Sequence, residues 1–163
     1  MNNTPPGLPV TATASFYHTT LLLGLLPGDP VVKWAETYIE QHETAPSPFF
    51  DIVSTPAGDI TALRYALHDL CNGTVSPEVL RSVFTLIRAQ YTDGKRSFDD
   101  TMRVLFQVRY FLKLEKPLAD TINTFETDYE SAVHNGATTG LEKNIAVWLK
   151  QISGGADDLN TIQ

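Results

Sequence analysis

Apolar side chains recur every three or four residues through most of the chain, which is the spacing typical of amphipathic helices. The most apolar such stretch runs from Ser97 to Lys116, and its apolar residues cover about half of a helix circumference. These residues are Met102, Val104, Leu105, Val108, Phe111 and Leu112. Ser97 is a good N-cap, and Asp99 and Asp100 suit the positive end of the helix dipole. A helix this apolar needs neighbours on several sides, so we expect the rest of the chain to pack around it.

The same periodicity, together with turn residues, predicts further helices on both sides of this stretch. A first helix is expected from Ala14 to the break at Pro27-Gly28, and a second one restarts at Asp29-Pro30, so that the two form a helical hairpin or corner. The short apolar piece at 49–53 fits a helical turn or a short strand, and Ser47-Pro48 before it favours helix. Four more helices are predicted, each bounded by capping or turn residues, at 59–71, 76–92, 117–134 and 140–152.

This pattern predicts an all-α fold: a single globular domain of six or seven mostly antiparallel helices. No long run of alternating β-branched residues indicates a sheet. The later helices start roughly every 20 residues, which also suits a short superhelix of stacked helical hairpins, and this alternative stays open. We expect residues 1–13 to form a flexible N-terminal arm, 14–152 the helical domain, and 153–163 a flexible C-terminal tail.

Composition adds the expected environment of the protein. Hydrophobic residues make up 42% of the chain and charged residues 19%, as in globular proteins. The longest strongly apolar run, Leu21 to Leu26, is far shorter than the about 20 residues of a membrane span. A secretory signal begins with a positively charged region, and the sequence has no Lys or Arg before Lys33 to supply one. The single cysteine, Cys71, excludes an intrachain disulfide. We therefore expect a cytoplasmic protein that does not enter a membrane.

The net charge of −7 argues against a nucleic-acid partner, because most of the surface would repel phosphates. Residues 78–116 are an exception, with eight basic and five acidic groups. Neutralisation of acidic neighbours inside one fold explains this segment more simply than a nucleic-acid surface does.

The sequence lacks the motifs that mark common catalytic and cofactor sites. It contains no Gly-x-Ser-x-Gly, Gly-x-Gly-x-x-Gly, Walker loop, His-x-x-x-His or Cys-x-x-Cys. Glu126, Glu130 and His134 share one helix face, but a di-metal bundle uses Glu-x-x-His on two helices, so we interpret them as a solvated face. His18 and His68 fit no metal-ligand spacing, and Cys71 lies on an apolar stripe. We predict no metal and no cofactor, and the absent motifs favour a protein that is not an enzyme.

Three arginines, Arg88, Arg103 and Arg109, are the candidate binding residues, for an anion or for a partner. Arg103 and Arg109 belong to the most apolar helix, and Arg109 falls at the edge of its apolar arc. A partly buried guanidinium needs an anionic partner. That partner is either an acid of the same chain, which is the simpler interpretation, or an anionic ligand or acidic peptide.

Two functions remain open on the sequence. The first is a non-enzymatic helical protein that acts through a protein partner or through self-association, because we expect one core to leave some of its aromatic residues exposed. The aromatic residues in question are Tyr17, Trp34, Tyr65, Tyr110 and Trp148. The alternative is a small-molecule or anion-binding helical protein, or an enzyme, whose pocket lies in the bundle and leaves no linear motif.

Overall fold

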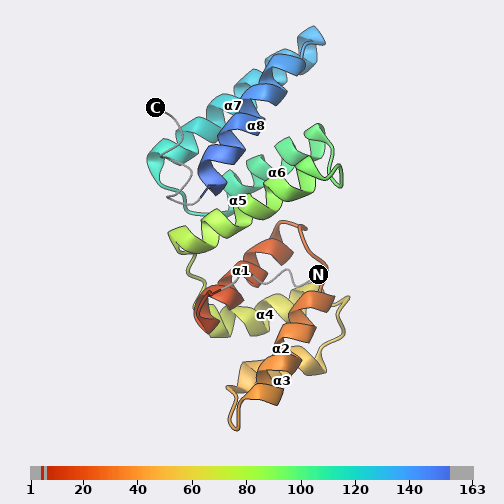
Figure 1. Ribbon diagram of the computed structural model, residues 1–163, viewed down its shortest axis with the longest axis vertical. Coiled ribbons are helices and arrows are strands. Elements are labelled where there is room, and N and C mark those ends of the chain that lie inside the picture. Colours follow the sequence, from red (N-terminus) through yellow and green to blue (C-terminus); the bar gives the residue numbers. More distant parts are fainter. Residues whose placement is uncertain (1–4, 6, 155–163) are drawn as a thin grey trace. The chain divides into compact units, whose positions relative to one another are not determined.

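The computed structural model describes residue 5 and residues 7–154, and every regular element within them is an α-helix (Figure 1). The helices are α1 (Val10–Leu22), α2 (Asp29–Gln41), α3 (Ser47–Ser54), α4 (Ile60–Cys71), α5 (Pro77–Thr92), α6 (Phe98–Phe111), α7 (Lys116–Asn135) and α8 (Thr139–Ser153). The prediction of an all-α fold is confirmed. The described residues form eight helices instead of six or seven, since the short apolar piece at 49–53 lies in a helix of its own, α3.

Contacts divide the chain into two compact units, Met1–Val83 and Phe84–Gln163, with the boundary inside α5. The range 14–152 that was predicted as the helical domain therefore includes parts of both units. The predicted C-terminal tail begins inside α8, which includes Ser153, and residues 155–163 lie outside the described part of the chain.

In the first unit α1 packs along α4, and α3 packs on both α2 and α4. The largest fully buried side chains of this unit come from α1, α3 and α4: Phe16, Tyr17, Phe49, Ile52, Leu63 and Leu67. The Trp34 ring of α2 lies 5.4 Å from the Tyr17 ring and 5.0 Å from the Phe49 ring. Because α1 packs mainly along α4, the break at Pro27-Gly28 makes a corner and not a packed hairpin.

Helix α1 begins and ends about four residues earlier than predicted. At its start, the backbone N–H of Thr13 donates to the carbonyl of Pro9 at 2.8 Å, and Thr13 is buried, so the predicted arm 1–13 is too long. At its end, Gly24 adopts a φ of +64° and the N–H of Leu25 donates to the Thr20 carbonyl at 2.8 Å. This left-handed turn closes the helix before the proline is reached. Residues 1–4 and 6 of the predicted arm lie outside the described residues.

In the second unit α7 packs on α6 and on α8. The Trp148 ring of α8 lies 5.5 Å from Phe84 of α5 and 5.1 Å from Phe125 of α7, both in edge-to-face contact. Such aromatic contacts stabilise a core beyond the area that they bury. The fully buried side chains of this unit include Phe84, Ile87, Met102, Leu105, Ile122 and Ile145.

Helix α6 has the predicted cap and most of the predicted buried face, but it is shorter than predicted. The Ser97 hydroxyl accepts from the backbone N–H of Asp100 at 3.1 Å, while Phe111 is 49% exposed and Leu112 is extended. The chain has to turn back here for α7 to pack on α6, so the predicted last turn becomes a loop. We expected the whole chain to pack around this helix, but the first unit has a core of its own around α4.

Candidate functional site

The three arginines predicted as a binding site each contact a side chain of their own unit. Arg109 Nη2 donates to Glu126 Oε2 of α7 at 2.5 Å, with 39% and 29% of the two side chains exposed. Arg103 Nη1 donates to Asp100 Oδ1 at 2.9 Å on the surface. Arg88 Nη1 makes a long hydrogen bond of 3.4 Å to the Ser153 hydroxyl. The internal partner of Arg109 fits the simpler interpretation, and ligand binding by the three arginines stays a prediction.

These contacts also define the charged surface around the arginines. Arg103 pairs with Asp100, whereas Asp99 accepts from the Tyr129 hydroxyl at 2.8 Å, and this hydrogen bond raises the pKa of Tyr129. Glu126 is half-buried against Arg109, so the interpretation of Glu126 as part of a solvated face is wrong. Arg103 and Arg109 are six residues apart on one helix, which places them roughly 120° apart around its axis.

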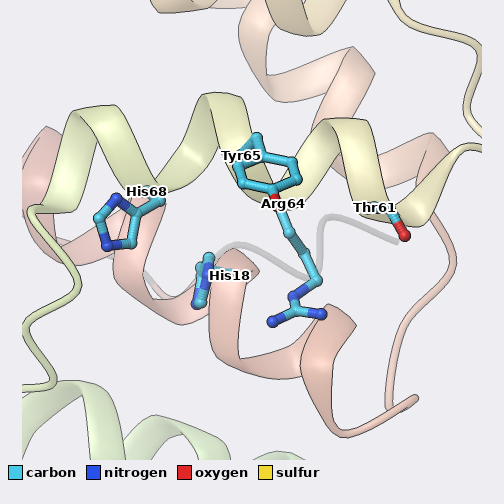
Figure 2. A pocket seen from close by; sticks show the side chains of 5 residues that line it. All are labelled: His18, Thr61, Arg64, Tyr65 and His68. Carbon is cyan, nitrogen blue, oxygen red and sulfur yellow. The ribbon is translucent and has the colours of Figure 1, made fainter.

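A pocket of about 370 Å³ opens instead on the surface of the α1–α4 pair (Figure 2). It is lined by one residue of α1, His18, and by four residues of α4, namely Thr61, Arg64, Tyr65 and His68. The four α4 residues are spaced i, i+3, i+4 and i+7, so they share one side of the helix. Another side of α4 is buried, through Leu63, Ala66, Leu67 and Cys71. Core packing of α4 thus leaves the pocket residues facing outward.

Arg64 is the charged group of this pocket, and one of its guanidinium nitrogens, Nε, is buried without a partner in the described residues. Figure 2 shows its side chain extending from α4 toward α1, with His18 between it and His68. Within the described part of the chain Arg64 forms no ion pair, and its Nε is buried without a hydrogen-bond acceptor. A buried donor left unpaired costs about 1–3 kcal/mol. Arg64 is thus a cationic group that forms no ion pair with any carboxylate of residues 7–154.

The two histidines lie next to each other in this pocket, and His18 is the one nearer to Arg64 (Figure 2). Their ring centroids lie 6.0 Å apart. Burial, and then the charges of Arg64 and His68, lower the pKa of His18 from 6.5 to about 4. His18 is therefore a neutral imidazole at neutral pH. A Cβ on Gly73 would lie 2.8 Å from Nε2 of His68, so this glycine leaves room for the second imidazole.

The lowered pKa of His18 makes the stability of the fold depend on pH. Between about pH 6.5 and 4 the unfolded chain takes up a proton at His18 and the folded chain does not, so stability falls as the pH falls through this window. Because the site is only half-buried, solvent screening reduces the effect, and we expect a loss of about 1 kcal/mol. Urea unfolding at pH 7 and pH 4.5 measures it. The loss should shrink in His18→Gln and persist in His42→Gln, a control on the exposed end of α2; an equal loss in both variants would contradict this assignment.

Other groups of the described residues offer less. A second pocket of about 510 Å³ is lined by residues between 7 and 15 and between 74 and 79, and its charged residue is Glu78. Unlike the first pocket, its lining residues do not combine a cationic side chain with hydrogen-bond donors. No group of three or more His, Cys, Asp or Glu within the described residues could hold a metal ion. Cys71 is buried and burial raises the pKa of its thiol, so it is a poor nucleophile.

The sequence analysis missed Arg64 although two signals pointed to it. Arg64 and Lys33 are the basic residues before residue 78, and Thr61, Arg64, Tyr65 and His68 repeat at helical spacing.

None of the helices between residues 7 and 154 is both long and apolar enough to cross a membrane. No protein-family model, curated protein or solved structure matches this chain. The pocket is therefore interpreted from its own residues.

Proposed function

We propose that this protein binds a small anion in the α1–α4 pocket, which keeps the anion-binding alternative from the sequence but places it at residues other than Arg88, Arg103 and Arg109. The observation that carries this proposal is Arg64, whose guanidinium has no carboxylate partner and whose Nε has no acceptor within the described residues. A charged group held in this state is costly. The oxygens of a carboxylate, sulfate or phosphate fit the planar guanidinium and would satisfy it.

The neighbours of Arg64 suit an anion better than a cation. Imidazole N–H groups of His18 and His68 and the hydroxyl of Thr61 are hydrogen-bond donors at the same pocket. The positive charge of Arg64 would repel a metal ion bound by the two histidines. The volume of about 370 Å³ falls within the range of small-molecule sites, roughly 300–1,000 Å³. A cytoplasmic location belongs to the same proposal, because the buried, unpaired thiol of Cys71 suits a reducing compartment.

Anion binding should strengthen as the pH falls. A negative charge beside His18 favours its imidazolium form and so raises its pKa above the value of about 4 in the free protein. Between the two pKa values binding takes up a proton, so affinity rises from pH 7.5 toward pH 5. Calorimetric titration with sulfate, whose own charge is constant in this range, measures the affinity, and two buffers of different ionisation heat measure the proton uptake.

The variant His18→Gln separates this effect from the general increase in positive charge at low pH. We expect His18→Gln to bind sulfate with a much flatter pH dependence and no proton uptake at the pocket. A wild-type protein that binds neither sulfate nor an organic carboxylate at any pH in this range would overturn the proposed function. An affinity that falls with decreasing pH would contradict the role of His18.

A second candidate function is self-association through the second unit. The side chains of Tyr110 and Phe111, at the end of α6, are 83% and 49% exposed, and their rings meet edge to face at 5.0 Å. Of the aromatic residues singled out from the sequence, Tyr110 and Tyr65 are exposed while Tyr17 is buried. Exposed aromatic side chains are enriched at protein interfaces, and their burial against a second copy would remove them from water.

Sedimentation equilibrium over a range of protein concentrations tests this candidate. We expect the wild-type average mass to rise with concentration and the variant Tyr110→Ser/Phe111→Ser to stay monomeric. Tyr65→Ser, which removes an exposed tyrosine of the first unit, is the matched control and should behave as wild type. A wild-type protein that stays monomeric to its solubility limit would rule out self-association.

A further inference from the structure

The rings around Arg64 indicate which kind of anion the pocket takes, an inference that rests on the proposed function. Three of the five lining residues, His18, Tyr65 and His68, carry flat rings. Tyr65 is 74% exposed, which makes it one of the most exposed large hydrophobic residues in the described part of the chain. It lies on the same side of α4 as Arg64 (Figure 2). An exposed ring of this size next to a binding site is a surface on which a ligand can lie.

The volume of the pocket argues against an inorganic anion as its natural occupant. At about 30 Å³ for each water molecule, a pocket of about 370 Å³ has room for roughly ten waters. A tetrahedral anion on Arg64 would leave most of that space, and Tyr65, unused. The ligand therefore has an organic part as well as a charged head.

The charges of the pocket limit the head group to a small net charge. Arg64 is the fixed cation among the lining residues, and His18 is neutral at neutral pH because its pKa is lowered. Apart from Arg64 and the two histidines, the lining residues are uncharged, namely Thr61 and Tyr65. One guanidinium matches the single charge of one carboxylate, or of one phosphate that carries two substituents.

We propose that the α1–α4 pocket binds an aromatic organic anion, with the charged head on Arg64 and a flat ring against Tyr65. The imidazoles of His18 and His68 lie beside the head group and donate hydrogen bonds to it. Offset or edge-to-face contact between the ligand ring and the phenol of Tyr65 supplies affinity that a saturated ring of the same size does not obtain.

Benzoate and cyclohexanecarboxylate test this proposal, because they share charge and approximate size and differ in aromaticity. Calorimetric titration of wild-type protein should show benzoate binding roughly two- to tenfold more tightly, the range that aromatic pairs contribute. The preference should persist in Tyr65→Phe, which keeps the ring, and vanish in Tyr65→Leu, which keeps an apolar side chain. Tyr110→Leu, at the exposed tyrosine of the second unit, should leave the preference unchanged. Because Tyr65 is largely exposed, these variants are expected to fold.

The remaining outcomes separate this inference from the function on which it rests. Equal affinities for the two carboxylates, together with saturable binding of sulfate or acetate, would overturn the aromatic ligand and leave anion binding standing. A preference for benzoate that survives in Tyr65→Leu would overturn the role of Tyr65. Failure of benzoate, acetate and sulfate to bind at all would overturn the proposed function, and the inference with it.

Discussion

Replacing Gly28 by alanine is expected to lower the free energy of unfolding by roughly 3 kcal/mol, at the upper end of the usual cost of overpacking. Gly28 lies before α2, and a Cβ at this residue would lie 2.0 Å from the Ala57 carbonyl oxygen and 2.6 Å from Leu63 Cδ1. A backbone oxygen cannot rotate away as a side chain can. Either the loop before α4 or the start of α2 has to move, and the Leu63 side chain that the Cβ would also meet is fully buried.

The matched control for this change is Gly58→Ala. Gly58 lies in the loop before α4, does not have a positive φ, and has no atom within 4 Å of an added Cβ. Urea unfolding should show little change for Gly58→Ala and a clear loss for Gly28→Ala. Similar stabilities for the two variants would mean that the close approach of Gly28 to Ala57 is not a packing constraint.

Replacing Arg64 by methionine is expected to weaken anion binding roughly 10- to 100-fold, the loss typical of a charge-assisted hydrogen bond. The same change should leave the stability of the free protein unchanged or raise it, since Arg64 has no ion pair to lose among the described residues and its buried Nε is unsatisfied there. Sulfate titration and urea unfolding of one variant measure the two effects. Arg64→Lys keeps the charge but not the planar group, so we expect an intermediate affinity.

If Arg64 only stabilised the fold, Arg64→Met would have the opposite effects on stability and on sulfate affinity. Arg103→Met is the matched control, because Arg103 is exposed and paired with Asp100 in the second unit, and it should leave sulfate affinity unchanged. If Arg64→Met lowered the stability and left the affinity as in wild type, Arg64 would be part of the scaffold and the proposed site would be wrong.

Local patterns in the sequence predicted the helices well because local chemistry determines where most of them begin. The Asp59 carboxylate accepts from the N–H of Ala62 at 3.0 Å, and the Ser97 hydroxyl caps α6 in the same way, as capping residues do. The ends of α1 and α6 were predicted less well. Gly24 closes α1 before Pro27, the residue that we had used to predict its end. Helix α6 ends where α7 has to pack against it, and a tertiary contact of this kind leaves no local pattern in the sequence.

The candidate site was harder to predict because its parts come from distant segments. His18 and His68 are about fifty residues apart in the sequence, and only the packing of α1 along α4 brings their rings within 6.0 Å. Arg103 and Arg109 drew attention because they interrupt an apolar helix. The acid that pairs with Arg109, Glu126, belongs to α7, so the sequence alone could not identify this partner.

The most direct test of anion binding uses the four histidines of the protein as reporters. His18 and His68 line the pocket, whereas His42 and His134 are exposed at the ends of α2 and α7. Proton NMR of the imidazole Cε1–H signals during a sulfate titration at constant ionic strength and pH follows all four. We predict saturable shifts of His18 and His68 with one common dissociation constant, while His42 and His134 stay in place. Shifts of all four signals by similar, non-saturating amounts, or of none, would contradict an anion site in the α1–α4 pocket.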